Sequence, residues 1–269
     1  MEQRTAGLTA GGAAVPTLAM VQTDDDPAAG YYLRSIERAF ERHGLATVRR
    51  QLDHPDQAAL AALLDELSAE SGFTGILLTQ PLPAPLRLDL AVRHLHPEKD
   101  VEGAHPIHVG ALAQGQWGIV PSTPLAGMEI LKAAGTRLRG ASTVIVGRSQ
   151  ILGRPLIQLL LAQDATVTVC HSRTADLGAV TRQADVLLVA TGRAGLIDGS
   201  MVKPGATVID FGINEVDGKL VGDADVASVS EVAGAITPVP GGVGPVTTAV
   251  LARNLVELAE RARRPGAVD

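Results

Sequence analysis

The chain has 269 residues, of which 46% are hydrophobic, 19% charged and only 2% aromatic, a balance typical of a globular α/β protein with two lobes. A formal net charge of -6 and the scarcity of aromatic side chains exclude nucleic acid as an expected partner, because phosphate backbones need a basic surface and bases stack on aromatic rings. The single cysteine, Cys170, leaves no internal disulfide, and no apolar run reaches the roughly 18 residues that span a bilayer, so we expect a cytoplasmic protein without a membrane partner.

Strands and helices alternate along the first part of the chain. Residues 1–15 are rich in Gly, Ala and Thr, and we expect them to form an irregular lead-in. An apolar run follows and stops at a turn around Asp24, after which apolar residues recur with helical spacing. The expected elements are a strand over 15–23, a helix over 28–43, a helix over 55–69 and a strand over 75–78.

A second series of alternating elements begins near residue 124. Its β-branched runs predict buried strands, and the apolar stripes between them predict crossover helices, so the strands are expected to be parallel. The expected elements are helices over 124–134, 155–162 and 247–263, and strands over 142–146, 165–170, 184–190 and 206–211. The predicted fold class is therefore α/β, with two lobes of which the second is Rossmann-like.

The loop after the strand 142–146 has the composition of a phosphate-binding turn. Gly147, Arg148 and Ser149 lead to Gly153 and Pro155, and proline suits the first turn of a helix. Glycine permits close backbone approach, and free N–H groups at a helix start attract a pyrophosphate. The spacing is not G-x-G-x-x-G, so an ordinary tight turn between strand and helix is an alternative.

The end of the next strand favours NADP over NAD. An NAD-selective fold usually carries an acidic side chain about 20 residues after the glycine loop, where it binds the ribose hydroxyls. Here Cys170 is followed by His171, Ser172 and Arg173, which suit a 2′-phosphate. Arg148 can join this pocket from the first loop, or it can be a surface arginine that caps a helix.

Eight sequence blocks in order resemble the bifunctional methylenetetrahydrofolate dehydrogenase/methenyltetrahydrofolate cyclohydrolase family of one-carbon metabolism. The resemblance spans most of the chain and carries the identification more firmly than any single motif. The blocks are GILLTQPLP from residue 75, PEKDVEGAHP from 97, PSTPLAG from 121, GRSQILGRP from 147, TVTVCHSRT from 166, VATG from 189, DFGIN from 210 and ITPVPGGVGPVT from 236.

This resemblance implies a folate-type catalytic domain at 1–123 and 246–269, a Rossmann-like NADP-binding domain at 124–245, and a homodimer. Compared with the family pattern, the chain starts about one helix later. Two groups of residues are implied to bind the cofactor and the folate. For NADP they are Gly147, Arg148, Ser149, Ser172, Arg173, Thr191, Gly192 and Ile213; for the folate they are Tyr32, Glu102, Pro240, Gly241 and Gly242.

The folate site departs from the family pattern at three positions. The family motif Y-x-x-x-K begins here at Tyr32, but its lysine is replaced by Ile36. The family glutamine that supports this lysine is replaced by Thr79, and Gln80 follows one place later, on the other face of a strand. The acidic residue expected to hold the pterin is Glu102 instead of aspartate. Isoleucine neither donates nor accepts a proton, so the hydrolytic step loses the group that handles its proton.

We therefore expect NADP-dependent oxidation of 5,10-methylenetetrahydrofolate, or a close analogue, with weak or absent cyclohydrolase activity. Tyr32, Glu102, Ile36 and Thr79 mark the catalytic positions. An ordinary bifunctional enzyme is one alternative, and a catalytically silent NADP- or folate-binding sensor is another. His105 and His108 lack further ligands, so no metal is expected.

Overall fold

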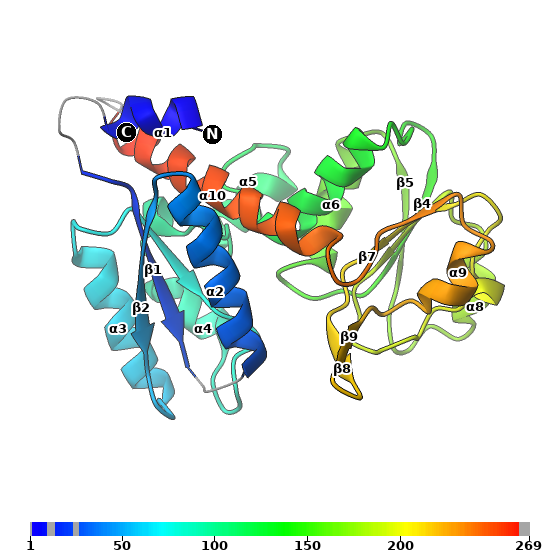
Figure 1. The fold of residues 1–269 in the computed structure, drawn as a ribbon, viewed down its shortest axis with the longest axis horizontal. Helices are drawn as coiled ribbons and strands as arrows, with labels where there is room; N and C mark the ends of the chain where they lie inside the picture. Colours follow the sequence, from blue (N-terminus) through cyan, green and yellow to red (C-terminus); the bar gives the residue numbers. More distant parts are fainter. Residues whose placement is uncertain (1, 10–13, 24–26, 264–269) are drawn as a thin grey trace. The chain divides into compact units, whose positions relative to one another are not determined.

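The chain divides into two compact units in a computed structural model, which describes residues 2–9, 14–23 and 27–263. One unit consists of Met1–Val120 with Thr248–Asp269, and the other of Pro121–Thr247 (Figure 1). Each is an α/β structure around its own parallel sheet, which confirms the predicted fold class. The turn predicted at Asp24 lies outside the described residues.

The first unit is built around the central strand β1 (Thr17–Gln22). Strand β2 (Ala46–Gln51) pairs with it on one side and β3 (Gly75–Leu78) on the other, both in parallel. Because side chains alternate along a strand, β1 serves two cores. Leu18 and Met20 lie in one core with the helices α2 and α10, and Ala19 and Val21 lie in the other with α3. The helices are α2 (Pro27–Arg42), α3 (Gln57–Ala69), α4 (Leu88–Ala91), α5 (Pro106–Ala113) and α10 (Val243–Ala262).

Helix α10 returns the chain to the first unit after the second unit is complete. Leu251, Leu255 and Val256 of this helix are fully buried in the core shared with α2. The buried Asn254 donates from Nδ2 to the carbonyl oxygens of Val101 (3.0 Å) and Val120 (2.9 Å). The last helix is therefore an integral part of the first unit's interior.

The second unit contains five parallel strands among its described residues, in the order β10-β7-β6-β4-β5. Val, Leu and Ile residues fill the central strands because both faces of a parallel sheet are covered. The strands are β4 (Ser142–Val146), β5 (Thr166–Cys170), β6 (Val186–Val189), β7 (Thr207–Asp210) and β10 (Ala235–Ile236), and the helices are α6 (Ser122–Ala133), α7 (Gly153–Leu161), α8 (Leu177–Thr181) and α9 (Val226–Ser230).

Several elements depart from the sequence expectation. The lead-in expected to be irregular contains helix α1 (Glu2–Thr9), in which Arg4 donates to Glu257 and Glu260 of α10. Strand β2 escaped prediction because it is an edge strand with arginines and little buried surface. The antiparallel pair β8 (Asn214–Val216) and β9 (Lys219–Val221) also escaped, because each strand is short and largely exposed.

None of the helices in the described part of the chain is both long enough and apolar enough to cross a bilayer.

Candidate functional site

The loops after β4 and β5 lie side by side at the carboxyl end of the second unit's sheet. Val146 pairs with Cys170 at the ends of the two strands, and the Gly147 amide donates to the Cys170 carbonyl (2.9 Å). Parallel α/β sheets bind ligands at this edge. The structure therefore brings together Gly147, Arg148 and Ser149 of one loop with Ser172 and Arg173 of the other; their contact with a nucleotide stays a prediction.

Gly147 and Gly153 are required by the close packing of the first loop. Gly147 has φ +130, and a Cβ on it would lie 2.2 Å from the Ala190 carbonyl oxygen. A Cβ on Gly153 would lie 2.5 Å from the Gly147 carbonyl oxygen. This turn brings the amide-bearing start of α7 under the loop, and Ser149 Oγ accepts from the Gly153 amide. The two glycines therefore let the loop, the start of α7 and the Ala190 carbonyl pack closely, and the start of a helix attracts anions such as a phosphate.

The second loop is a tight turn with exposed side chains. The His171 amide donates to Thr174 Oγ1 (2.9 Å) and the Arg173 amide donates to His171 Nδ1 (3.1 Å), so the histidine ring orders the turn. The side chains of Ser172, Arg173 and Arg148 are exposed. Two arginines and a hydroxyl are thus presented at neighbouring strand ends, with no acidic residue at the end of β5.

The loop after β6 carries a buried polar atom without a partner. The Ala190 amide pairs with the Val146 carbonyl, which places Thr191 and Gly192 beside the Gly147 loop. Thr191 Oγ1 is buried and has no hydrogen-bond partner.

Two further segments contain predicted site residues. Ile213, which follows β7, has an exposed side chain. The loop through Pro240, Gly241 and Gly242 closes with a bond from the Gly242 amide to the Pro238 carbonyl (3.0 Å) just before α10 begins.

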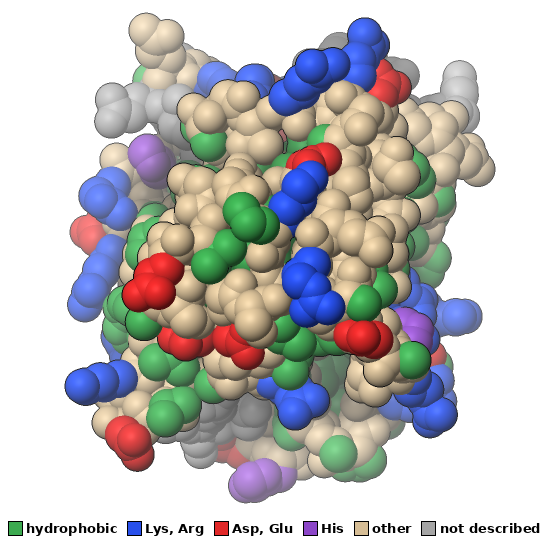
Figure 2. Space-filling view, turned by 90° about the vertical axis from the view of Figure 1, so that its right-hand side faces the viewer, with side chains coloured by type: hydrophobic (Ala, Val, Ile, Leu, Met, Phe, Trp, Pro, Cys, Tyr) green, Lys and Arg blue, Asp and Glu red, His purple; other side chains and the backbone are tan. Residues whose placement is uncertain are grey.

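Charged side chains are mixed over the face of the molecule drawn in Figure 2. Lys and Arg side chains lie among Asp and Glu side chains there and do not form one continuous basic patch.

In the first unit, Tyr32 and Glu102 come together at the carboxyl end of the sheet. Tyr32 of α2 packs against the core of β1 and α10. Ile76 of β3 and Asp100 form a parallel β-bridge, so the segment that contains Glu102 lies alongside β3. Burial raises the pKa of the Tyr32 hydroxyl, and the nearby negative charge of Glu102 raises it further. Tyr32 is consequently a neutral hydroxyl beside a carboxylate.

Ile36 and Thr79 do not present reactive groups at this place. Ile36 is 0% exposed and belongs to the hydrophobic core with Leu33 and Phe40. The Thr79 hydroxyl is buried and donates to the Val21 carbonyl oxygen of β1 (3.0 Å). The two positions at which the resemblance predicts a loss of acid–base groups therefore carry a core side chain and a hydroxyl that is bonded to the backbone.

Gln80 follows Thr79, and the sequence provides no reason to assign it a role. Its Nε2 is buried and has no hydrogen-bond partner, while the neighbouring Thr79 is bonded to β1. The expectation that Gln80 lies on the other face of a strand is not met, because β3 ends at Leu78 and Gln80 lies in a bend. The sequence shows an amide side chain next to the expected position. Only the structure shows that the Nε2 group of this side chain is buried without a hydrogen-bond partner.

Asp100 orders the loop that carries Glu102. It is 0% exposed and accepts from the amides of Glu102 (3.2 Å) and His105 (2.7 Å), so it is a structural residue. His105 Nδ1 accepts from the Ile107 amide at the start of α5, and His108 Nε2 bonds to the Pro97 carbonyl. No group of three or more His, Cys, Asp or Glu able to hold a metal occurs in the described part of the chain.

Comparison with known proteins matches both parts of the chain to one family. Residues 121–263 match the NAD(P)-binding domain of tetrahydrofolate dehydrogenase/cyclohydrolase, and residues 1–102 match its catalytic domain. A relative from Chloroflexus aurantiacus, the bifunctional protein FolD, is 55% identical over 243 residues, which cover 90% of this chain and 85% of the relative.

Solved structures of the same kind superpose closely. The bifunctional methylenetetrahydrofolate dehydrogenase/cyclohydrolase FolD from Campylobacter jejuni has a TM-score of 0.91 and 41% identity, covering 97% of this chain and 93% of that one. The enzyme from Trypanosoma brucei, solved with NADP cofactor and an inhibitor, has a TM-score of 0.92 and 34% identity, covering 98% and 93%.

Proposed function

Because this chain belongs to the tetrahydrofolate dehydrogenase/cyclohydrolase family, we propose that it oxidises 5,10-methylenetetrahydrofolate to the methenyl form with NADP. The observation that carries the proposal is the pair of nucleotide loops at the ends of β4 and β5, which present Arg148 and Arg173 without an acidic neighbour at the end of β5. The folate-type unit would then be Met1–Val120 with Thr248–Asp269, and the NADP unit Pro121–Thr247.

The described residues fit a dinucleotide. Thr191 Oγ1 is a buried hydroxyl without a partner, and it lies beside the Gly147 loop, which approaches the Ala190 carbonyl closely. Arg148, Ser172 and Arg173 would hold the 2′-phosphate by charge-assisted hydrogen bonds. When bound, NADP supplies the hydride acceptor, and the protein sets the distance and orientation of the reacting carbons.

Tyr32 and Glu102 would bind the folate. The carboxylate of Glu102 suits the amino and ring N–H edge of a pterin, which offers only donors at that edge. The neutral Tyr32 hydroxyl beside it can donate to the substrate. Neither group needs to transfer a proton for hydride removal, because the hydride leaves the methylene carbon with its electron pair and leaves a cationic methenyl bridge.

Hydrolysis of the methenyl bridge is the activity on which the observations differ. The relatives compared are bifunctional proteins, and they favour an ordinary bifunctional enzyme as the second candidate function. Two features of this chain support a weak cyclohydrolase instead. Ile36 lies in the core without a titratable group, and the Thr79 hydroxyl is bonded to Val21.

Steady-state assays of both half-reactions on the purified protein test the proposal. NADPH formation from 5,10-methylenetetrahydrofolate should be measurable, and methenyltetrahydrofolate hydrolysis should be much slower. Equal rates would establish the bifunctional enzyme, and tight NADP binding without either reaction would establish a sensor. Homodimerisation and a cytoplasmic location stay predictions, and sedimentation and cell fractionation test them.

A further inference from the structure

The backbone of the loop after β6 is held by one buried carboxylate, that of Asp223. Its Oδ2 accepts from the amides of Thr191 (2.5 Å) and Gly192 (3.0 Å), and its Oδ1 accepts from the amide of Arg193 (2.9 Å). Three consecutive N–H groups of the loop therefore end on a single side chain that is 0% exposed.

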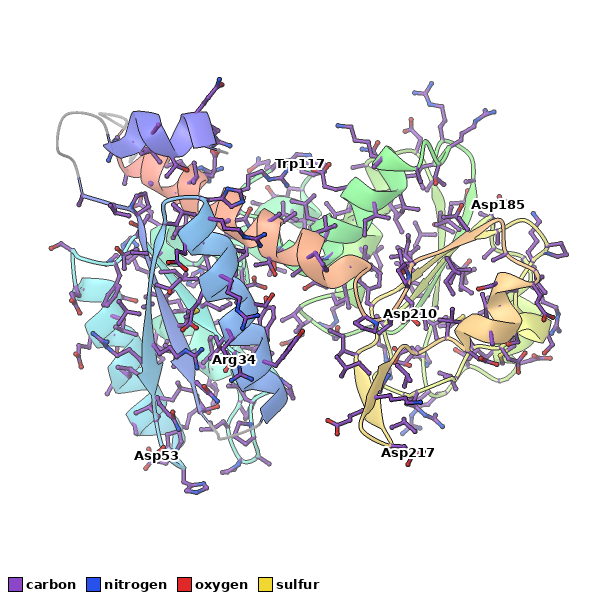
Figure 3. All side chains as sticks on the ribbon, in the orientation of Figure 1. Arg34, Asp53, Trp117, Asp185, Asp210 and Asp217 are labelled. Atoms are coloured by element: carbon purple, nitrogen blue, oxygen red, sulfur yellow. The ribbon has the colours of Figure 1, made fainter. Side chains whose placement is uncertain are left out.

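Asp223 is itself fixed from two directions. Asn214 Nδ2 donates to its Oδ1 (2.9 Å), and its own amide donates to Asp210 Oδ1 (3.1 Å). Asp210 lies at the end of β7 (labelled in Figure 3) and also accepts from the amides of Gly212 and Ala224. Burial raises the pKa of Asp210, and the charge of Asp223 raises it further. The two carboxylates thus tie the ends of β6 and β7 to the start of the segment after β9.

This arrangement decides which groups the loop can offer to a ligand. Consecutive free amides make an anion-binding concavity, but the amides of Thr191, Gly192 and Arg193 are already bonded to a carboxylate. The loop is therefore unsuited to a phosphate, although it lies beside the Gly147 loop. What remains is the Thr191 hydroxyl, which is buried and without a partner. A ligand group that exchanges a hydrogen bond with a hydroxyl fits this position.

We propose that Asp223 is a positioning residue for cofactor binding, which acts by fixing the 191–193 loop so that the Thr191 hydroxyl meets the uncharged part of the dinucleotide. This inference rests on the proposed NADP function. Asp223 does not touch the cofactor. Its contribution is to hold the backbone in one conformation before the cofactor arrives, so that binding does not have to order the loop.

The variant Asp223→Asn tests this role with little change of shape. A carboxamide has one acceptor oxygen, so it can serve either the Thr191 and Gly192 amides or the Arg193 amide and Asn214, and its NH₂ faces donors on the other side. Asp225→Asn is the matched control, because Asp225 is two residues away and also accepts from a backbone amide, that of Ala227 at the start of α9.

The measurements are the dissociation constant of NADP, the separate KM values of NADP and folate, thermal stability, and hydrogen exchange of the 191–193 amides. For Asp223→Asn we expect faster exchange in this loop and NADP binding weaker by about tenfold or more, the scale of a lost charge-assisted bond. The folate KM should change by less than about threefold, since the loop acts on the cofactor. Asp225→Asn should leave NADP binding unchanged.

NADP binding within about twofold of the unaltered protein, despite faster exchange in the loop, would overturn the proposal. If Asp223→Asn does not fold, Asn214→Ala removes one of the donors to Asp223, and it should give a smaller loss of NADP affinity together with faster loop exchange. Unchanged affinity in that folded variant would overturn the proposal equally. If the unaltered protein fails to bind NADP, the proposed function is wrong, and this outcome is distinct from the others.

Discussion

Arg148 and Arg173 are the only residues in the two nucleotide loops whose side chains carry a fixed positive charge close to neighbouring strand ends. Both are exposed, and the structure gives neither of them an acidic partner to compete with a phosphate. Guanidinium groups bind phosphate in bidentate fashion, whereas the ribose hydroxyl of NAD offers them no charge. Cofactor choice is therefore expected to depend on these two side chains.

Replacing Arg173 with glutamate should weaken NADP binding much more than NAD binding. A charge-assisted contact contributes roughly 1.5–3 kcal/mol, so a loss of about tenfold or more in NADP affinity is expected, while a carboxylate there can accept from the ribose of NAD. Titration of both cofactors against the unaltered protein and Arg173→Glu measures the ratio. Arg182→Glu, on the same unit but in the segment after α8, is the control. Equal affinity for both cofactors in the unaltered protein would contradict the assignment.

Introducing the proton-transfer groups that the resemblance implies, through Ile36→Lys with Thr79→Gln, should raise methenyltetrahydrofolate hydrolysis if the proposed weak cyclohydrolase is correct. General acid–base catalysis supplies about 10²–10⁴-fold, and the gain should approach the lower end of this range. The position of Ile36 adds a second expectation. A lysine there enters a core with Leu33 and Phe40, so its burial lowers its pKa and decreases stability. Hydrolysis rates and thermal denaturation measure the two effects, with Ile36→Met as the uncharged control.

If the unaltered protein already hydrolyses methenyltetrahydrofolate as fast as it forms NADPH, Ile36 does not impair the cyclohydrolase activity. The missing proton-transfer group at Ile36 stays a prediction, whereas the apolar helical spacing of α2 agrees with the burial of this side chain. The surroundings of a single polar atom are harder to predict, because they are set by neighbours that can be distant in the chain. The unused Gln80 amide and the carboxylate of Asp223 were missed for the same reason.

At the scale of the elements, the loop between β4 and α7 depends on the absence of side chains at its glycines. Gly147 combines a φ that L side chains rarely adopt with a close approach to the Ala190 carbonyl of the neighbouring strand end. A single methyl group there must move either this loop or the loop after β6. The nucleotide loop is thus coupled to its neighbour through backbone contact.

Gly147→Ala should destabilise the protein and reduce NADP binding together. The backbone strain accounts for roughly 1–2 kcal/mol, and the collision adds about 1–3 kcal/mol. Gly140→Ala separates the two contributions, because Gly140 has φ +74 with no atom within 4 Å of an added Cβ. Chemical denaturation of both variants measures the difference. Equal destabilisation by the two substitutions would show that the contact between the added Cβ and the Ala190 carbonyl does not lower the free energy of unfolding.

The central strands and long helices were predictable because each has a strong periodic pattern. Strands β3 and β4 were predicted with their observed bounds, since their apolar runs stop at a polar residue or glycine. Strand β2 and the pair β8 and β9 were not, because edge strands expose their side chains and do not need an apolar pattern. Helix α1 is amphipathic only weakly, and its ion pairs with α10 are invisible in sequence.

At the scale of the whole molecule, one unit is continuous in sequence and the other is not. The second unit has a hydrophobic cluster, from Val144 to Ile236, that lies entirely within Pro121–Thr247. The first unit takes Leu251, Leu255 and Val256 from the far end of the chain. A contiguous unit with its own core can fold by itself, whereas the first 120 residues lack one wall of their interior.

The fragment 121–247 should therefore fold alone, and the fragment 1–120 should not. Burying a Val or Leu side chain contributes about 1.5–3 kcal/mol, so three such residues amount to roughly 5–9 kcal/mol, comparable with the stability of a whole domain. Circular dichroism and denaturation of each fragment test this, and a peptide spanning 243–263 should restore structure to the fragment 1–120. Cooperative unfolding of that fragment without the peptide would contradict the expectation.

The interrupted first unit also sets the order in which the chain can fold as it is synthesised. Asn254 satisfies the carbonyls of Val101 and Val120, but α10 is translated only after the entire second unit. Contacts between residues so distant in sequence form late, because the entropic cost of closing a long loop precedes the stabilisation that the contacts provide. The apolar faces of α2 and β1 are made first and covered last. They are consequently the surface of the nascent chain that a chaperone would meet for longest, and the place where premature association between chains would begin.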